Sequence, residues 1–138
     1  MSVLSDELQG RIDVKDVARV KLMLSNKEAL MDCIPGITKV SGDEFRIVKK
    51  IAFLTLVLTG RMTDFEVGED YIRNHVEVTG PGVKLSVFSN FVFQGFSVTY
   101  TIRYSLEASN SIIESVASKE SREISKDIVS CIEKKLKS

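Results

Sequence analysis

The side chains best suited to catalysis or metal binding are few in this chain and far apart in sequence. His75 is the only histidine, and Cys33 and Cys131 are the only cysteines. A structural zinc site needs about four ligands from such residues, so we expect no metal. The sequence also contains no nucleophile elbow and no glycine loop that would hold a phosphate. We therefore predict no cofactor and assign no catalytic residue.

His75 belongs to a stretch, residues 70–79, in which apolar and polar residues alternate. Val76 would face the core, which places His75 on the opposite, solvent-facing side with Arg73 and Glu77. A general base needs a partner and a pocket, and an outward position provides neither. We interpret His75 as a surface residue, and an enzymatic activity stays open but unsupported.

The two cysteines, Cys33 and Cys131, show neither a CxxC spacing nor a basic-then-apolar leader before them. In such a chain two thiols are more often small buried hydrophobic groups than a disulfide. No stretch approaches the ~20 apolar residues that a membrane span needs. We therefore expect free, buried thiols in a cytoplasmic protein that has no membrane span.

Length and composition indicate one globular domain, residues 1–138. Apolar residues make up 43% of the chain and charged residues 28%, which is ordinary for such a domain. Nineteen basic residues balance nineteen acidic ones. No overall field would attract nucleic acid, so nucleic acid is not an expected partner.

Hydrophobic periodicity predicts a strand, two short helices, six strands and one long helix. Capping boxes are expected at Ser25 with Glu28 and at Ser111 with Glu114. The expected strands are residues 3–12, 37–40, 44–50, 53–67, 70–79, 83–93 and 95–107, and the expected helices lie within 13–26, 25–32 and 109–137.

The last expected strand shows the clearest alternation, with Phe96, Val98, Tyr100, Ile102, Tyr104 and Leu106 on one side. Such alternation is typical of an antiparallel sheet with one wet face. A sheet of long strands must curve to bury that face against a single helix. We therefore predict an α+β fold in which a curved seven-stranded antiparallel sheet, with two short helices after strand 1, wraps around one long C-terminal helix. A space is expected between the sheet and that helix.

The segment LMLSNKEALMDCIPGITKVSGDEFRI, residues 22–47, resembles the signature of the CoxG family of carbon monoxide dehydrogenase subunits. In that family a short helix leads into Ile-Pro-Gly, here Ile34, Pro35 and Gly36, and then into two short strands. The order of elements along nearly the whole chain is similar to the START and birch-pollen-allergen-like helix-grip (SRPBCC) superfamily. The resemblance implies a helix-grip fold and a lipid or quinone-like ligand. Some members carry a membrane anchor, which we do not expect here because the last helix ends at Ser138.

The inward-facing side chains of the strands and of the last helix are expected to line a ligand cavity rather than only a solid core. The candidate cavity residues are Leu56, Ile72, Asn74, Val76, Val87, Ser89, Phe91, Val98, Tyr100, Ile102, Tyr104, Ile113, Val116 and Ala117.

Polar residues interrupt this inner face. Asn74 and Ser89 alternate with the outward residues as their apolar neighbours do, so they are expected on the inner face. Lys49 is expected on the same face as Phe45 and Ile47. A buried polar group needs a partner, a water or a ligand. Lys49 is either a polar anchor for the ligand or a strand-end residue whose long stem reaches water.

The connection after the second helix is unusually apolar for a turn. We interpret it as a flap over the cavity mouth, with Gly36 supplying the backbone freedom for the bend. The flap residues are Met31, Ile34, Pro35, Gly36 and Ile37.

The sequence thus favours a non-enzymatic protein that binds a small hydrophobic ligand. The alternative, which the resemblance implies, is an accessory protein that docks on a molybdenum-type carbon monoxide dehydrogenase or a related redox enzyme. Val57 and Phe65 are apolar exceptions on the predicted wet face, and they could also form a homodimer contact. A hydrolase or cyclase ranks last, because it needs two converging titratable groups and Lys49 is the one inward charge on the middle strands.

Overall fold

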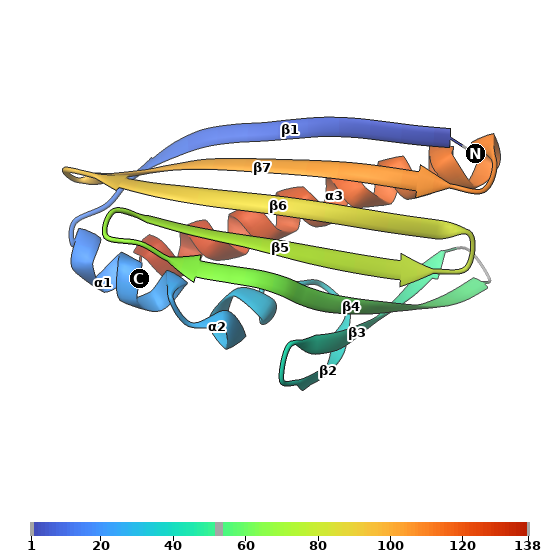
Figure 1. Cartoon of the computed structure of the whole chain (residues 1–138), viewed down its shortest axis with the longest axis horizontal. Coiled ribbons are helices and arrows are strands. Elements are labelled where there is room, and N and C mark those ends of the chain that lie inside the picture. The colour runs from blue at the N-terminus through green and yellow to red at the C-terminus, as the bar shows by residue number, and fades with distance from the viewer. Residues whose placement is uncertain (1, 52–53, 138) are drawn as a thin grey trace.

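The computed structural model describes residues 2–51 and 54–137. Their elements follow one another as predicted: one strand, two short helices, six strands and a long helix (Figure 1). The bounds are β1 Ser2–Asp13, α1 Val17–Leu24, α2 Lys27–Met31, β2 Ile37–Ser41, β3 Glu44–Ile51, β4 Leu54–Val67, β5 Tyr71–Gly80, β6 Val83–Gln94, β7 Ser97–Ala108 and α3 Ser111–Lys137. The predicted start of the fourth strand at Phe53 lies outside the described residues.

All seven strands form one antiparallel sheet in the order β1-β7-β6-β5-β4-β3-β2. Neighbours in the chain are neighbours in the sheet from β2 to β7, and β1 joins the far edge beside β7. The alternation in each strand therefore gives the sheet one apolar and one polar face, because side chains alternate along a strand.

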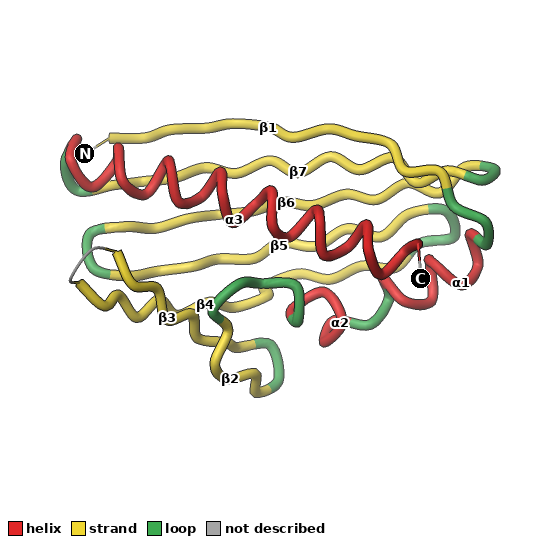
Figure 2. Tube along the Cα trace, turned by 180° about the vertical axis from the view of Figure 1, so that it is seen from behind, coloured by secondary structure: helices red, strands yellow, loops and turns green. Residues whose placement is uncertain are grey.

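The long helix α3 lies across the apolar face of the sheet (Figures 1 and 2). Its 27 residues correspond to about 40 Å of helix, enough to cross the sheet. It runs from the edge near the start of β1 to the end where α1 and α2 lie (Figure 2). The predicted fold class is confirmed. No helix within residues 2–51 and 54–137 combines the length and the apolar character that a bilayer crossing requires.

Two glycines let large aromatic side chains lie flat on the sheet. Tyr100 of β7 pairs with Gly10 of β1, and a Cβ on Gly10 would lie 2.2 Å from the Tyr100 hydroxyl oxygen. Phe45 of β3 pairs with Gly60 of β4, and a Cβ there would lie 2.2 Å from the Phe45 ring. Both rings thus cover a neighbouring strand, which is one reason for a glycine inside a strand.

Asparagine, rather than the predicted serine capping boxes, begins two of the helices. The Asn26 side chain accepts a hydrogen bond from the Glu28 amide at the start of α2, while Ser25 ends α1. At the start of α3 the Asn110 side chain accepts from the Ile113 amide at 2.9 Å. The predicted boxes were wrong by one residue each, because Asn caps as well as Ser does.

A β-bulge in β4 changes which residues face inward. The pairing of β4 with β5 shifts between Met62 and Asp64. The extra residue reverses the alternation, so Phe65 packs against the buried core. Its predicted place on the wet face was wrong, whereas Val57, which precedes the bulge, is half exposed on that face.

The buried side chains form two clusters on the helix side of the sheet. One cluster joins α1 and the C-terminal part of α3 to the middle strands, and the other lies beneath α2 and the connection that follows it. The first contains Ile12, Val14, Val20, Leu24, Cys33, Ile72, Phe91, Phe93, Val98 and Ile132. The second contains Met31, Phe45, Ile47, Met62 and Val78.

Candidate functional site

A partly enclosed cavity of about 130 Å³ lies between the sheet and the C-terminal half of α3. Its wall combines residues of both core clusters with residues of α3, and most of them are apolar. The lining residues are Leu30, Met31, Ile34, Phe45, Ile47, Met62, Asn74, Val76, Val78, Leu85, Val87, Ser89, Phe91, Ile102, Ser121, Ile124, Ser125, Ile128 and Ile132.

The centre of the sheet supplies the candidate residues that the structure brings to this cavity. They come from β5, β6 and β7, whose long strands cross beneath α3. The candidates in the wall are Asn74, Val76, Val87, Ser89, Phe91 and Ile102.

Four other candidates on these strands do not line the cavity. Ile72 and Val98 are completely buried in the solid cluster near α1. The ring of Tyr100 lies over Gly10, and the Tyr104 hydroxyl donates to Oδ2 of Asp6 at 3.3 Å. Burial is the main cause that raises the pKa of both tyrosines. The strand alternation placed them on the correct face but could not show that their rings lean toward β1.

The candidates on α3 and at the start of β4 also lie elsewhere. Ile113 approaches Gly82 at the β5–β6 turn, and Val116 is 41% exposed. Neither Ala117 nor Leu56 belongs to the wall of the cavity. The apolar spacing of α3 identifies its buried face, but it does not show which turns of the helix cross the cavity.

Several lining residues were not among the predicted candidates. On the strands they lie at alternate positions from predicted inward-facing residues and so face the same side, as Phe45 and Ile47 do with Lys49. On α3 they continue the helical spacing of Ile113, Val116 and Ala117 toward the C-terminus. The lining residues outside the predicted cavity list and flap are Leu30, Phe45, Ile47, Met62, Val78, Leu85, Ser121, Ile124, Ser125, Ile128 and Ile132.

The predicted flap lies at the cavity, but only two of its residues line it. Met31 and Ile34 are in the wall. Ile37 packs against the second cluster, and Pro35 is half-buried. Gly36 has a φ of 77°, and a Cβ there would lie 2.8 Å from the Val48 carbonyl oxygen. The expected backbone role of Gly36 is confirmed, because L side chains rarely adopt this conformation.

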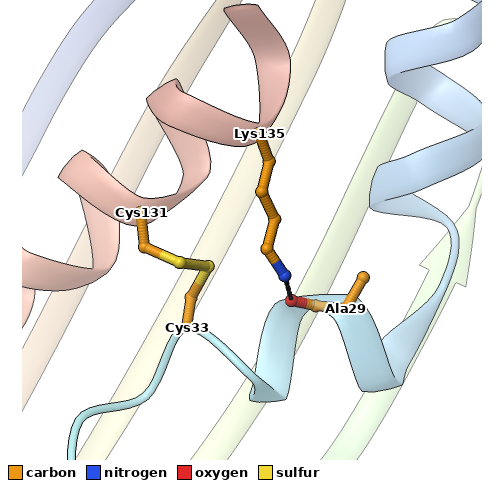
Figure 3. Close-up of a disulfide and its surroundings, with 4 residues drawn as sticks. All are labelled: Ala29, Cys33, Cys131 and Lys135. Atoms are coloured by element: carbon orange, nitrogen blue, oxygen red, sulfur yellow. Dashed lines mark hydrogen bonds between the residues drawn. A yellow bond between two sulfur atoms is a disulfide. The ribbon is translucent and has the colours of Figure 1, made fainter. Parts of the chain in front are cut away.

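A disulfide joins Cys33 of this connection to Cys131 of α3 (Figure 3). The expectation of free thiols was wrong, because the fold brings two residues 98 positions apart to a Cα–Cα distance of 5.5 Å, which suits a disulfide. Next to it, Nζ of Lys135 donates to the Ala29 carbonyl oxygen at 3.0 Å. The cytoplasmic location stays a prediction, and the disulfide weighs against it because cytosolic thiols are kept reduced.

Lys49 does not reach into the cavity. Its Nζ lies 3.1 Å from Oε2 of Glu120, and the side chains are 33% and 22% exposed. The ion pair connects β3 to α3 beside the cavity wall. The contact of Glu120 with Lys49 was not predicted, because helical spacing alone does not show which turn of α3 faces β3.

The opposite face of the sheet carries His75, as predicted, but its side chain is only 20% exposed. The imidazole stacks on Phe88 with ring centroids 4.1 Å apart, and Nδ1 lies 2.9 Å from Oγ1 of Thr63. A hollow there is lined mostly by charged and polar side chains, including Arg73 and Arg103. Its described lining residues come from the strands and the β4–β5 connection and not from a helix, so it offers little enclosure to an apolar molecule.

The wall of the cavity beneath α3 combines apolar side chains with a few neutral polar ones. Every described residue of its wall is neutral, and none of these carries a carboxylate, an ammonium or an imidazole. A mostly apolar lining with a few polar groups is typical of binding sites for small molecules.

Comparisons with known proteins identify the family of this chain and solved structures with the same fold. The family model for the CoxG subunit of carbon monoxide dehydrogenase matches residues 10–137. A search of curated proteins gave no match.

Solved structures with the same fold share little sequence with this chain. An aromatase/cyclase (Zhui) from a Streptomyces species is 11% identical, with a TM-score of 0.65 over 98% of this chain and 94% of that one. A START superfamily protein from Mycobacterium smegmatis is 14% identical, with a TM-score of 0.60 over 97% and 96%. A conserved protein from Geobacillus kaustophilus is 15% identical, with a TM-score of 0.64 over 96% and 95%. At these identities the likeness shows the fold alone.

Proposed function

The chain belongs to the CoxG family of carbon monoxide dehydrogenase subunits, and on that premise we propose that it binds a small hydrophobic ligand, lipid or quinone-like, between the sheet and α3. The observation that carries the proposal is the apolar cavity of about 130 Å³. Burial of ligand surface would drive binding at about 25 cal/mol per Å², less the cost of immobilising the ligand.

The size of the cavity limits which part of a ligand it can hold. An apolar cavity of about 150 Å³ in another protein holds one benzene molecule. The cavity beneath α3 is of similar size, at about 130 Å³. The buried part of the ligand is thus one ring or a short aliphatic branch, and a longer tail would remain outside.

Two matched variants test this function. Val76→Phe places a larger side chain in the cavity, because Val76 is part of its wall. Val57→Phe makes the same change on the opposite face of the sheet, where Val57 is 50% exposed. We would measure the thermal shift of each protein with one-ring and two-ring quinones, phenols and fatty acids. Val57→Phe should bind as the wild type does, and Val76→Phe should lose binding while keeping its circular dichroism spectrum.

Native mass spectrometry of protein purified from its own host complements the panel. A stoichiometric apolar molecule, extracted from the wild type and absent from Val76→Phe, would support the proposal. No bound molecule, together with an unchanged melting temperature across the panel, would refute it.

Docking on a redox enzyme is the second candidate function, and the family name suggests a carbon monoxide dehydrogenase. Phe88 supports it, because this aromatic side chain is 51% exposed on the outer face beside Arg73 and Arg103. Exposed aromatic and arginine side chains are enriched at protein interfaces. Phe88→Ala should weaken co-purification with such an enzyme and leave cavity ligands bound. Val76→Phe should lose the cavity ligands and leave co-purification unchanged.

A further inference from the structure

Four neutral polar side chains interrupt the otherwise apolar wall of the cavity. Asn74 of β5 and Ser89 of β6 are directly paired across the two strands. Ser121 and Ser125 lie one turn apart on α3, so they share one face of that helix. The sheet and the helix therefore each present two polar groups to the same cavity.

The most buried members of this set have no hydrogen-bond partner among the described residues. Asn74 is 8% exposed and Ser121 is 9% exposed. In the part of the chain that the structure describes, neither side chain makes a hydrogen bond. Buried polar side chains are nearly always hydrogen-bonded, to protein, water or ligand. Two unpartnered ones in the same wall therefore point to a bound polar group.

The charges near the cavity indicate that this polar group is neutral. Glu120, which precedes the wall residue Ser121, lies 3.1 Å from Lys49, and each charge compensates the other. Among the residues that the structure describes, none in the wall itself is charged. A carboxylate placed here would lose its hydration without gaining a cation, which is unfavourable.

We propose that Asn74, Ser89, Ser121 and Ser125 recognise a neutral ring that carries a hydroxyl or carbonyl oxygen, and that they exclude carboxylates. This inference rests on the proposed function and specifies the ligand class for the same cavity. The Asn74 amide can both donate and accept, as the serine hydroxyls can, so either kind of oxygen finds a partner. The ring occupies the apolar volume between the two polar pairs.

Three probes of one shape test the polar recognition by isothermal titration. They are p-cresol, toluene and p-toluate, which present a hydroxyl, no polar group and a carboxylate on the same ring. The wild type should bind p-cresol roughly tenfold more tightly than toluene, the ratio that about one net hydrogen bond supplies. The p-toluate anion should bind most weakly.

The variants should remove the preference without removing the cavity. In Asn74→Leu and in Ser121→Ala, p-cresol should lose its advantage while toluene binds at least as well as to the wild type. Ser130→Ala, an exposed serine on the same helix, is the matched control and should behave as the wild type. The Ser121 variant removes a single oxygen, so it reports on recognition even if Asn74→Leu does not fold.

The outcomes separate this inference from the proposed function. Equal binding of toluene and p-cresol to the wild type, blocked by Val76→Phe, would overturn the polar recognition and leave the cavity function intact. A preference that survives in both variants would also overturn it, and binding of no probe would overturn both proposals. A fourth probe, 4-hexylphenol, distinguishes two kinds of natural ligand. Tighter binding than p-cresol indicates a lipid with a ring headgroup, and weaker binding indicates a free ring compound.

Discussion

The two halves of α3 meet the sheet in different ways. In the C-terminal half Ile132 is 5% exposed, and the neighbouring Cys131 is bonded covalently to Cys33. In the N-terminal half Ile112 is 77% exposed and Val116 is 41% exposed. The helix is therefore anchored at the α1 end and lies more loosely at the other end.

This difference matters because the cavity belongs to the anchored half. Its helical wall begins at Ser121 and ends at Ile132. The flap residues Met31 and Ile34 complete the wall on either side of Cys33. The disulfide thus holds together the two segments that enclose the cavity, and the following variants test how unequal the two halves are.

The largest expected effect is on the disulfide. Replacing both cysteines, Cys33→Ala with Cys131→Ala, should lower the free energy of unfolding by on the order of 4 kcal/mol, because the bond closes a loop of about a hundred residues in the unfolded chain. The 98-residue separation makes this entropy loss large. Urea denaturation of the oxidised wild type and of the double variant measures it.

A reducing agent provides the control for this experiment. It should shift the urea midpoint of the wild type toward that of the double variant and leave the double variant unchanged. Equal midpoints for the oxidised wild type and the double variant would show that the disulfide does not anchor this half of α3.

A matched pair of isoleucine substitutions compares the two halves by packing alone. Ile132→Ala should cost about 2–5 kcal/mol, because it leaves a void in a buried cluster. Ile112→Ala, on the exposed side of the other half, should change stability by less than about 0.5 kcal/mol. Comparable losses in chemical denaturation would mean that both halves are packed alike.

The cap of the loose half offers a smaller effect. Asn110→Ala removes the side-chain acceptor of the Ile113 amide and should cost about 1 kcal/mol. Amide hydrogen exchange should show faster exchange in the first turns of α3 and unchanged protection near Ile132. Faster exchange along the whole helix would show that the two halves open together.

The smallest effect concerns pH. Burial raises the pKa of Tyr104 above its ordinary 10.0, so the native state keeps this proton at a pH where the unfolded chain has lost it. The stabilisation is complete below about pH 10 and decreases as the pH rises further. Tyr104→Phe should flatten the alkaline part of the stability curve, which urea midpoints at several pH values would reveal. An equally steep curve in the variant would assign the loss to another group.

Several features of the site were predictable because they depend on periodicity alone. Strand alternation placed Asn74, Val76 and Ser89 on the face that carries the cavity, because a period of two leaves only two choices. The same reasoning failed for Phe65, because one bulged residue in β4 reverses the alternation beyond it.

Other features depend on distances between segments that are remote in the chain. Pattern analysis identified the apolar face of α3 and predicted Ile113, Val116 and Ala117 as lining residues, whereas the helical wall of the cavity extends from Ser121 to Ile132. The position of a helix along a sheet depends on how well the side chains of both fill the space between helix and sheet. The spacing of apolar residues along the helix does not predict that packing.

The sequence by itself determined the order of the elements, the antiparallel sheet and the position of the Ile-Pro-Gly bend, because each follows from local periodicity or from the backbone limits of proline and glycine. Tertiary structure alone decided that Cys33 meets Cys131 and that Lys49 meets Glu120. It also decided that Asn74 and Ser121 line the same cavity of about 130 Å³. These pairs join segments that only the packing of α3 on the sheet brings together.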